Sequence, residues 1–103
     1  MVKVTIAPTA RLNIREIFDY IKRDSVHYAQ VEKSRIIEAI DTLRENPLIG
    51  KRVPELDDSN YREILFRRYR IIYKVISEDA LNVVAIQHQS RLLSNNPAFT
   101  KGL

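Results

Sequence analysis

Three apolar runs follow one another in the second half of the chain, at residues 61–66, 69–77 and 81–89. Together they are rich in β-branched and aromatic residues, which favour strands. The connections between them are only two and three residues long. Parallel strands need a crossover of a dozen or more residues, so these connections predict a three-stranded antiparallel meander. Arg67-Arg68 is poor chemistry for a two-residue turn, so we expect a slightly longer first turn.

The first half of the chain has a different periodicity. Residues 2–6 alternate and predict a short strand, and Pro8 suits the first turn of a helix. One apolar stripe then predicts a helix to about Arg23, formed by Ala10, Ile14, Ile17, Phe18 and Ile21. After a cap at Asp24-Ser25, a second stripe predicts another helix, which Asn46-Pro47 ends; its members are Ala29, Ile36, Ile37, Ile40 and Leu43.

The order of elements is therefore β-α-α-β-β-β. It predicts an α+β fold, with a helical hairpin packed on one face of a mostly antiparallel sheet, as a single domain over residues 1–103. Residues 47–60 are expected to be a loop and residues 92–103 an irregular, mobile tail. Because the strands are apolar on both parities and one helical pair covers one face, the second sheet face is expected to be open to a partner.

Length and composition exclude several classes of protein. The 103 residues and 12.0 kDa suit one small domain, and the absence of cysteine excludes disulfides, a thiol nucleophile and cysteine metal sites. No apolar run approaches the ~20 residues of a membrane helix. We therefore expect a cytoplasmic protein without membrane contact. P-loop, Rossmann, zinc and nucleophile-elbow motifs are absent, so neither a cofactor nor a metal is expected.

The positive charge lies in the second half of the chain. The formal net charge is +4, yet residues 8–46 carry seven basic and seven acidic side chains. Residues 47–103 carry nine basic and six acidic ones. This asymmetry indicates an acidic or polyanionic partner for the C-terminal half.

Arg62, Arg70, His88 and Arg91 form the constellation most suited to chemistry or target binding. In an antiparallel meander, the start of the second strand and the end of the third meet, so the last three are expected to converge, with Arg62 at the opposite end. Arg70 and His88 share even parity and should point to one face if no bulge intervenes. Spacing alone also fits a plainer interpretation, in which Arg62, Arg67 and Arg68 are solvated edge residues and His88 is a satisfied polar core residue.

Four segments together resemble a known family. They are Asn46-Pro47-x-x-Gly50-x-x-Val53-Pro54-Glu55-Leu56, Tyr61-Arg62-Glu63, Tyr69-Arg70-Ile71-Ile72-Tyr73 and Val84-x-Ile86-x-His88-Gln89-x-Arg91. In this order and spacing they resemble the RelE/ParE superfamily, the toxins of type II toxin–antitoxin modules once called plasmid-stabilisation proteins. The resemblance covers nearly the whole chain and implies a cognate antitoxin, which would mediate any contact with DNA.

The superfamily resemblance implies two alternative targets. RelE-like members are ribosome-dependent mRNA endonucleases, whereas ParE-like members inhibit DNA gyrase and are not nucleases. Arg62, Arg70 and Arg91 match three RelE-like places, but Ile64 replaces a basic residue and residues 92–103 contain no tyrosine. The segment from Ile86 to Ser90 is similar to the His-Gln segment of ParE-like chains. These features favour a gyrase inhibitor, with an mRNA endonuclease as the alternative and a basic domain that has lost toxicity as a third.

Elementary chemistry favours the same branch. Cleavage of RNA through its 2′-hydroxyl needs a base and an acid, and arginine cannot be the base. Only His88, and less plausibly Glu63, could accept the proton, so a nuclease would depend on Arg62, Arg70, His88 and Arg91. For a gyrase inhibitor the same four residues are target-binding candidates. The antitoxin is expected on the helical stripe, at Ile14, Phe18, Ile21, Ile36 and Ile40, and on the free sheet face.

Overall fold

The structure is a computed structural model that describes residues 1–91, 93 and 96–100. Its first half is a short strand, β1 (Lys3–Ile6), followed by a helical hairpin of α1 (Pro8–Lys22) and α2 (Val26–Asp41). Pro8 occupies the first turn of α1, and the Ser25 hydroxyl accepts a hydrogen bond from Tyr28 N at 3.0 Å, capping α2. The predicted hairpin is confirmed. Its second helix ends earlier than expected, passing into a 3₁₀ turn, η1 (Thr42–Arg44).

The second half supplies most of the sheet. Within the described residues, one sheet forms in the order β1-β5-β4-β3-β2, from β2 (Lys51–Arg52), β3 (Tyr61–Phe66), β4 (Tyr69–Ser77) and β5 (Ala80–His88) together with β1. The antiparallel meander is confirmed, and β1 joins it in parallel beside β5. The short strand β2 lies within the segment predicted to be a loop.

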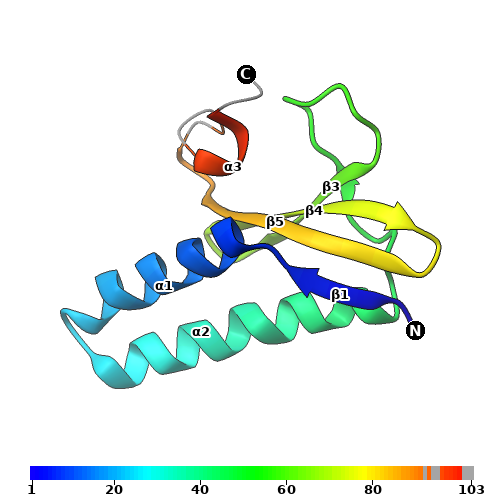
Figure 1. Ribbon diagram of the computed structural model, residues 1–103. Helices are drawn as coiled ribbons and strands as arrows, with labels where there is room; N and C mark the ends of the chain where they lie inside the picture. Colours follow the sequence, from blue (N-terminus) through cyan, green and yellow to red (C-terminus); the bar gives the residue numbers. More distant parts are fainter. Residues whose placement is uncertain (92, 94–95, 101–103) are drawn as a thin grey trace.

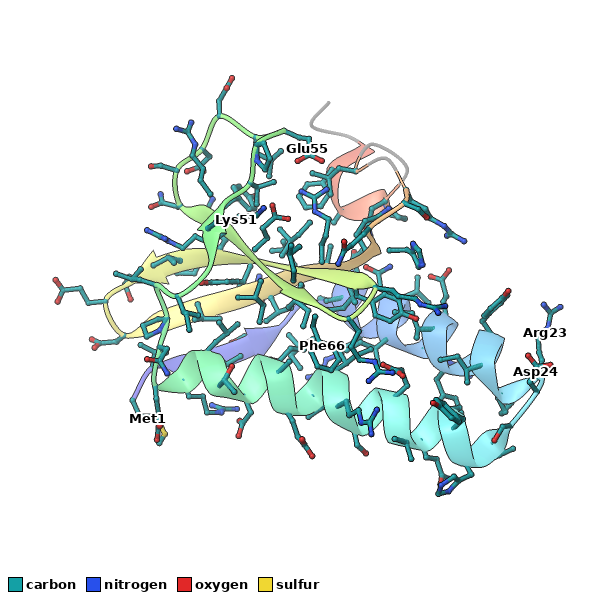
Figure 2. All side chains as sticks on the ribbon, turned by 180° about the vertical axis from the view of Figure 1, so that it is seen from behind. Met1, Arg23, Asp24, Lys51, Glu55 and Phe66 are labelled. Carbon is teal, nitrogen blue, oxygen red and sulfur yellow. The ribbon has the colours of Figure 1, made fainter. Side chains whose placement is uncertain are left out.

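The main core lies between the helical pair and one face of the sheet. Figure 1 shows α1 and α2 together on that side of the strands. Ile14, Ile36 and Ile40 from the helices pack there with Ile71 and Tyr73 from β4. The helical hairpin also extends past the sheet: Figure 2 shows Arg23 and Asp24 at its tip, well beyond Phe66 at the end of β3.

The second sheet face is covered by the chain itself, so the expectation of an open face is wrong. Val53 from the loop before β3 and Leu93 and Phe99 from the C-terminal segment bury Ile72 and Ala85. In Figure 1 this loop and the short helix α3 (Pro97–Thr100) lie on the side opposite α1 and α2. The described part of the tail is therefore packed rather than irregular, while residues 92, 94–95 and 101–103 lie outside the described residues.

The β3–β4 turn has only two residues, which corrects the expectation of a longer one. Arg67 adopts a positive φ of 57°, a conformation that glycine or asparagine usually supplies in such turns. Among the described helices, none is long and apolar enough to span a membrane.

Candidate functional site

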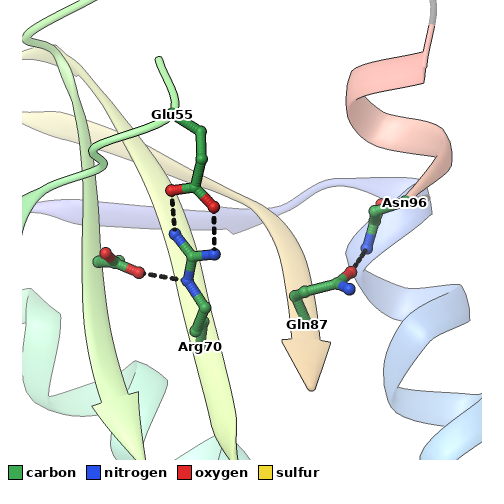
Figure 3. A network of polar contacts seen from close by, with 5 residues as sticks. Glu55, Arg70, Gln87 and Asn96 are labelled. Carbon is green, nitrogen blue, oxygen red and sulfur yellow. Dashed lines mark hydrogen bonds and ion pairs between the residues drawn. The ribbon is translucent and has the colours of Figure 1, made fainter. Parts of the chain in front are cut away.

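Arg70 lies on the second sheet face between two carboxylates. Its Nε donates to Glu63 Oε1 at 2.5 Å, while Nη1 and Nη2 donate to the two carboxylate oxygens of Glu55 at 2.6 and 2.8 Å. Figure 3 shows the paired bonds to Glu55. The Arg70 side chain is 11% exposed and that of Glu63 only 2%. The guanidinium therefore ties the loop before β3 to β3 and β4.

Electrostatics reinforce this arrangement. Hydrogen bonding to Arg70 lowers the pKa of Glu55 despite the opposing effect of burial. Hydrogen bonding to Glu55 raises the pKa of Arg70, again against the effect of burial. Both groups stay charged at neutral pH, and an anionic ligand could reach Arg70 only by displacing Glu55. Glu63 was named from sequence only as a less plausible base, and Glu55 was not a candidate, although it stands within the Val-Pro-Glu-Leu segment that carried the resemblance.

Arg62 lies apart from this cluster, as the meander predicted. Its Nη1 donates to the carbonyl oxygens of Gly50 at 2.7 Å and Leu48 at 3.2 Å. Gly50 N in turn donates to the Tyr73 hydroxyl at 2.9 Å. Arg62 therefore holds the segment that enters β2.

His88 and Arg70 lie on opposite faces of the sheet, so the prediction that they share a face is wrong. The β4–β5 ladder has two register shifts, which leave Ile76 of β4 and Val84 of β5 without partners. Because the two extra residues lie on opposite strands, their effects cancel, and the register of the two-residue turn between β4 and β5 holds again at the far end of the hairpin. Arg70 pairs there with Gln87 on the second face, whereas His88 pairs with Tyr69 on the helical face.

The His88 ring is held by a local turn. Its Nδ1 accepts a hydrogen bond from Ser90 N at 3.1 Å and lies 2.7 Å from Ser90 Oγ. A backbone N–H can only donate, so the neutral ring carries its proton on Nε2. The ring also stands edge-on to Tyr69, with 5.7 Å between the ring centroids. His88 therefore presents Nε2–H as a donor.

His88 and Arg91 line a cleft of about 690 Å³ between α1, the β3–β4 turn and the end of β5. Neither Arg68 nor Arg91 forms an ion pair with any residue that the structure describes. Arg68 was interpreted from sequence as a solvated edge residue. In the structure, the two-residue turn and the β5 register, which the sequence did not predict, bring it to this cleft. The charged and aromatic side chains around it are Glu16, Tyr20, Arg68, Tyr69, His88 and Arg91.

The residues expected to bind a partner on the helices divide into two groups. Ile14, Ile36 and Ile40 are at most 5% exposed because the protein's own sheet covers them, so they are corrected to core residues. Phe18 and Ile21 are half-buried. Phe18 lines a groove of about 500 Å³ along α1 and α2, whereas Ile21 lines the cleft.

The groove has an apolar floor and a basic rim. Ile37 of α2, which is 39% exposed, lies in it with Phe18. The Nζ atoms of Lys22 and Lys33 are 6.0 and 5.7 Å from the Phe18 ring centroid. Asp19 is the one acid among the lining residues, against four basic ones: Arg11, Arg15, Lys22 and Lys33.

Known proteins are similar to this chain over most of its length. Residues 4–93 match the family described as the ParE toxin of type II toxin–antitoxin systems, parDE. Toxin ParE1 of two Mycobacterium tuberculosis strains (CDC 1551/Oshkosh and ATCC 25618/H37Rv) is 28% identical over 92 residues, which are 88% of this chain and 93% of the relative.

Solved structures share the fold. The chromosomal ParDE toxin–antitoxin system from P. aeruginosa contains a chain that aligns with a TM-score of 0.70 and 18% identity, over 85% of this chain and 96% of that one. A chain of the YoeB-YefM complex from Staphylococcus aureus aligns with a TM-score of 0.55 and 13% identity, over 85% and 97% of the two chains.

Proposed function

Because the chain belongs to the family of ParE toxins of type II toxin–antitoxin systems, we propose that it arrests growth by inhibiting DNA gyrase and that a cognate antitoxin neutralises it. The site of action would be the cytoplasm, and contact with DNA would be made only through the antitoxin. The observation that carries the choice of gyrase is that His88 and Arg70 lie on opposite faces of the sheet. An inhibitor needs only a binding surface, whereas a nuclease needs its base beside the cation that stabilises the phosphate.

The state of each candidate group supports binding rather than proton transfer. The guanidinium of Arg70 is engaged by Glu55 and Glu63. His88 Nδ1 is occupied by Ser90, and Nε2 carries the proton in the neutral ring. His88 can therefore donate a hydrogen bond to a target at neutral pH but is poorly arranged to accept a proton. We assign it and Arg91 to target recognition in the cleft.

The antitoxin would dock in the groove along α1 and α2. Phe18 and Ile37 offer an apolar floor, and the rim carries an excess of positive charge. An amphipathic segment with apolar side chains on one face and acidic residues flanking them would match both properties. The structures of similar fold come from a ParDE toxin–antitoxin system and from a YoeB-YefM complex, which supports a partner of this kind.

One observation favours the alternative, a ribosome-dependent mRNA endonuclease. Glu55 is 43% exposed and lies against Arg70, so a carboxylate and a phosphate-binding cation stand side by side. The lowered pKa of Glu55 weakens it as a base. This alternative would place catalysis at Glu55 and Arg70, with Arg62, His88 and Arg91 as outer contacts.

A supercoiling assay with purified toxin separates the two functions. We expect the wild-type protein to block gyrase supercoiling and to leave mRNA on translating ribosomes intact. His88→Ala should weaken inhibition several-fold, because one donor to the target is lost, and Glu55→Gln should leave it unchanged. Codon-specific mRNA cleavage by the wild-type protein, lost in Glu55→Gln or in His88→Ala, would overturn the gyrase assignment.

A further inference from the structure

The β3–β4 turn carries backbone strain at an arginine. Arg67 is the one non-glycine residue with a positive φ among those that the structure describes, at 57°. Left-handed backbone is strained for an ordinary L-residue, and glycine or asparagine would largely avoid this strain. Strain of this kind persists only where the surroundings hold the residue, and it concentrates at functional sites.

Two neighbouring elements hold this turn. From α2, Glu32 Oε1 lies 2.9 Å from Arg67 Nε, and the Glu32 side chain is only 8% exposed. The contact acts through charge, because Oε1 accepts no hydrogen bond from the described part of the chain. From the end of β5, Gln89 Nε2 donates to Arg67 O at 2.9 Å, and Gln89 N donates to Arg68 O at 2.8 Å. The turn is therefore fixed on both sides.

This anchoring determines where the next side chain lies. Arg68 lines both the cleft with His88 and Arg91 and a second hollow of about 390 Å³, which Tyr28, Glu32, Arg67 and Tyr69 complete. The Arg67 guanidinium is committed to Glu32, whereas Arg68 has no acidic partner within the described ranges. One arginine of the pair is an anchor and the other is a free cation at the cleft mouth.

We propose that Arg68 contacts a negatively charged group of the toxin's target, and that Glu32 and Arg67 are positioning residues that hold it at the cleft. This inference rests on the proposed function, in which the cleft binds the target. A cation on a turn already fixed in its bound conformation loses less freedom when the target binds, so it contributes more affinity than a mobile one. The backbone strain at Arg67 is then the cost of placing Arg68.

The test compares growth arrest on induction with the melting temperature of each purified variant. Arg68→Ala should reduce toxicity at least tenfold without changing the melting temperature. Glu32→Gln combined with Arg67→Asn removes the buried carboxylate together with the cation opposite it, and asparagine suits the positive φ. This double variant should melt within a few degrees of the wild type yet lose at least fivefold in toxicity. The single variant Arg67→Lys, which keeps a positive charge opposite an unchanged Glu32, should lose less toxicity than the double variant.

Arg35→Ala is the matched control, since it removes an exposed α2 arginine that lines neither hollow, and it should change neither quantity. Full toxicity of a folded Arg68→Ala variant would overturn the proposal. Full toxicity of the double variant would overturn the positioning role. The growth-arrest assay reports toxicity whichever target the protein acts on. Wild-type arrest without gyrase inhibition would therefore refute the gyrase assignment, while the comparison of variants still decides the role of Arg68.

Discussion

Arg70 and Glu55 form a two-pronged ion pair, with Nη1 2.6 Å from one carboxylate oxygen and Nη2 2.8 Å from the other. Planar pairing of this kind fixes geometry as well as charge. It fastens the loop before β3 to the sheet beside the apolar cluster of the second face, in which Val53 packs against Ile72. Glu55 thereby engages one of the four residues that the sequence suggested for target binding.

Arg70→Ala should destabilise the fold strongly. The substitution leaves Glu63, at 2% exposure, as a buried carboxylate without its cation, which costs about 3–5 kcal/mol. Arg70→Lys should recover only part of this, since an ammonium cannot reproduce the guanidinium's fork. Urea unfolding measures the loss of stability in the alanine variant and in the lysine variant. Glu63→Gln with Arg70→Met should recover most of the stability, and an unchanged midpoint for Arg70→Ala would make this arginine a bystander.

The Glu55 pair should make stability depend on acid pH. Because the folded-state pKa of Glu55 is lowered, its contribution is complete above the ordinary glutamate pKa of about 4.3 and is lost as pH falls through the folded value. Glu55 is 43% exposed, so the contribution is under about 1 kcal/mol. Thermal melts of wild type and Glu55→Gln should differ at pH 7, and the difference should shrink as the pH is lowered below the ordinary glutamate pKa. A constant difference across this range would contradict the assignment.

The fold was largely predictable because its signals are local. Short connections dictated the meander, the helical stripes dictated the hairpin, and Ser25 marked the start of α2. The cover on the second sheet face was not predictable, because it depends on contacts between Val53, Ile72 and Phe99, which are far apart in sequence. The parallel pairing of β1 with β5 is equally non-local.

The candidate site was harder to predict for a specific physical reason. The faces of β4 and β5 depend on a two-residue turn and on two register shifts, at Ile76 and Val84, and no residue type there announces a bulge. Counting parity therefore placed His88 with Arg70, where the structure places Gln87. Similarly, Arg67 and Arg68 look equivalent in sequence, and only Glu32 on α2 distinguishes the anchored arginine from the free one.

Gly50→Ala should destabilise the entry into β2. A Cβ at this position would lie 2.7 Å from the Tyr73 hydroxyl and 2.8 Å from Glu63 O, closer than packed atoms approach. Overpacking of this kind lowers the free energy of unfolding by about 1–3 kcal/mol, which urea unfolding can measure. Tyr73→Phe, which removes the acceptor of Gly50 N while opening space, is the informative partner. If the double variant is no more stable than Gly50→Ala alone, contact with the hydroxyl is not the cause.

Asn13 should prove essential to the end of β5. Its side-chain oxygen accepts from Ile86 N at 3.1 Å and from Asn96 Nδ2 at 3.0 Å, and Figure 3 shows Asn96 also meeting Gln87. Asn13→Ala leaves the buried Ile86 N–H without its acceptor and should cost about 1–3 kcal/mol. Amide exchange at Ile86 should quicken, while Leu12→Ala, at a half-exposed neighbour, should leave it protected. Unchanged exchange at Ile86 would show that this bond is not needed.

Ile37→Glu should separate neutralisation from toxicity. Ile37 is 39% exposed in the groove of α1 and α2 and lines neither the cleft nor the hollow at the β3–β4 turn. A carboxylate there removes apolar contact and repels an acidic segment, so antitoxin affinity should fall at least tenfold while growth arrest without antitoxin stays at the wild-type level. Co-purification with the product of the adjacent gene and rescue of growth by its co-expression measure the two effects.

Ile49→Glu places the same charge on an apolar side chain that is 65% exposed outside the groove, and it should preserve rescue. Full rescue of Ile37→Glu would move the antitoxin to another surface.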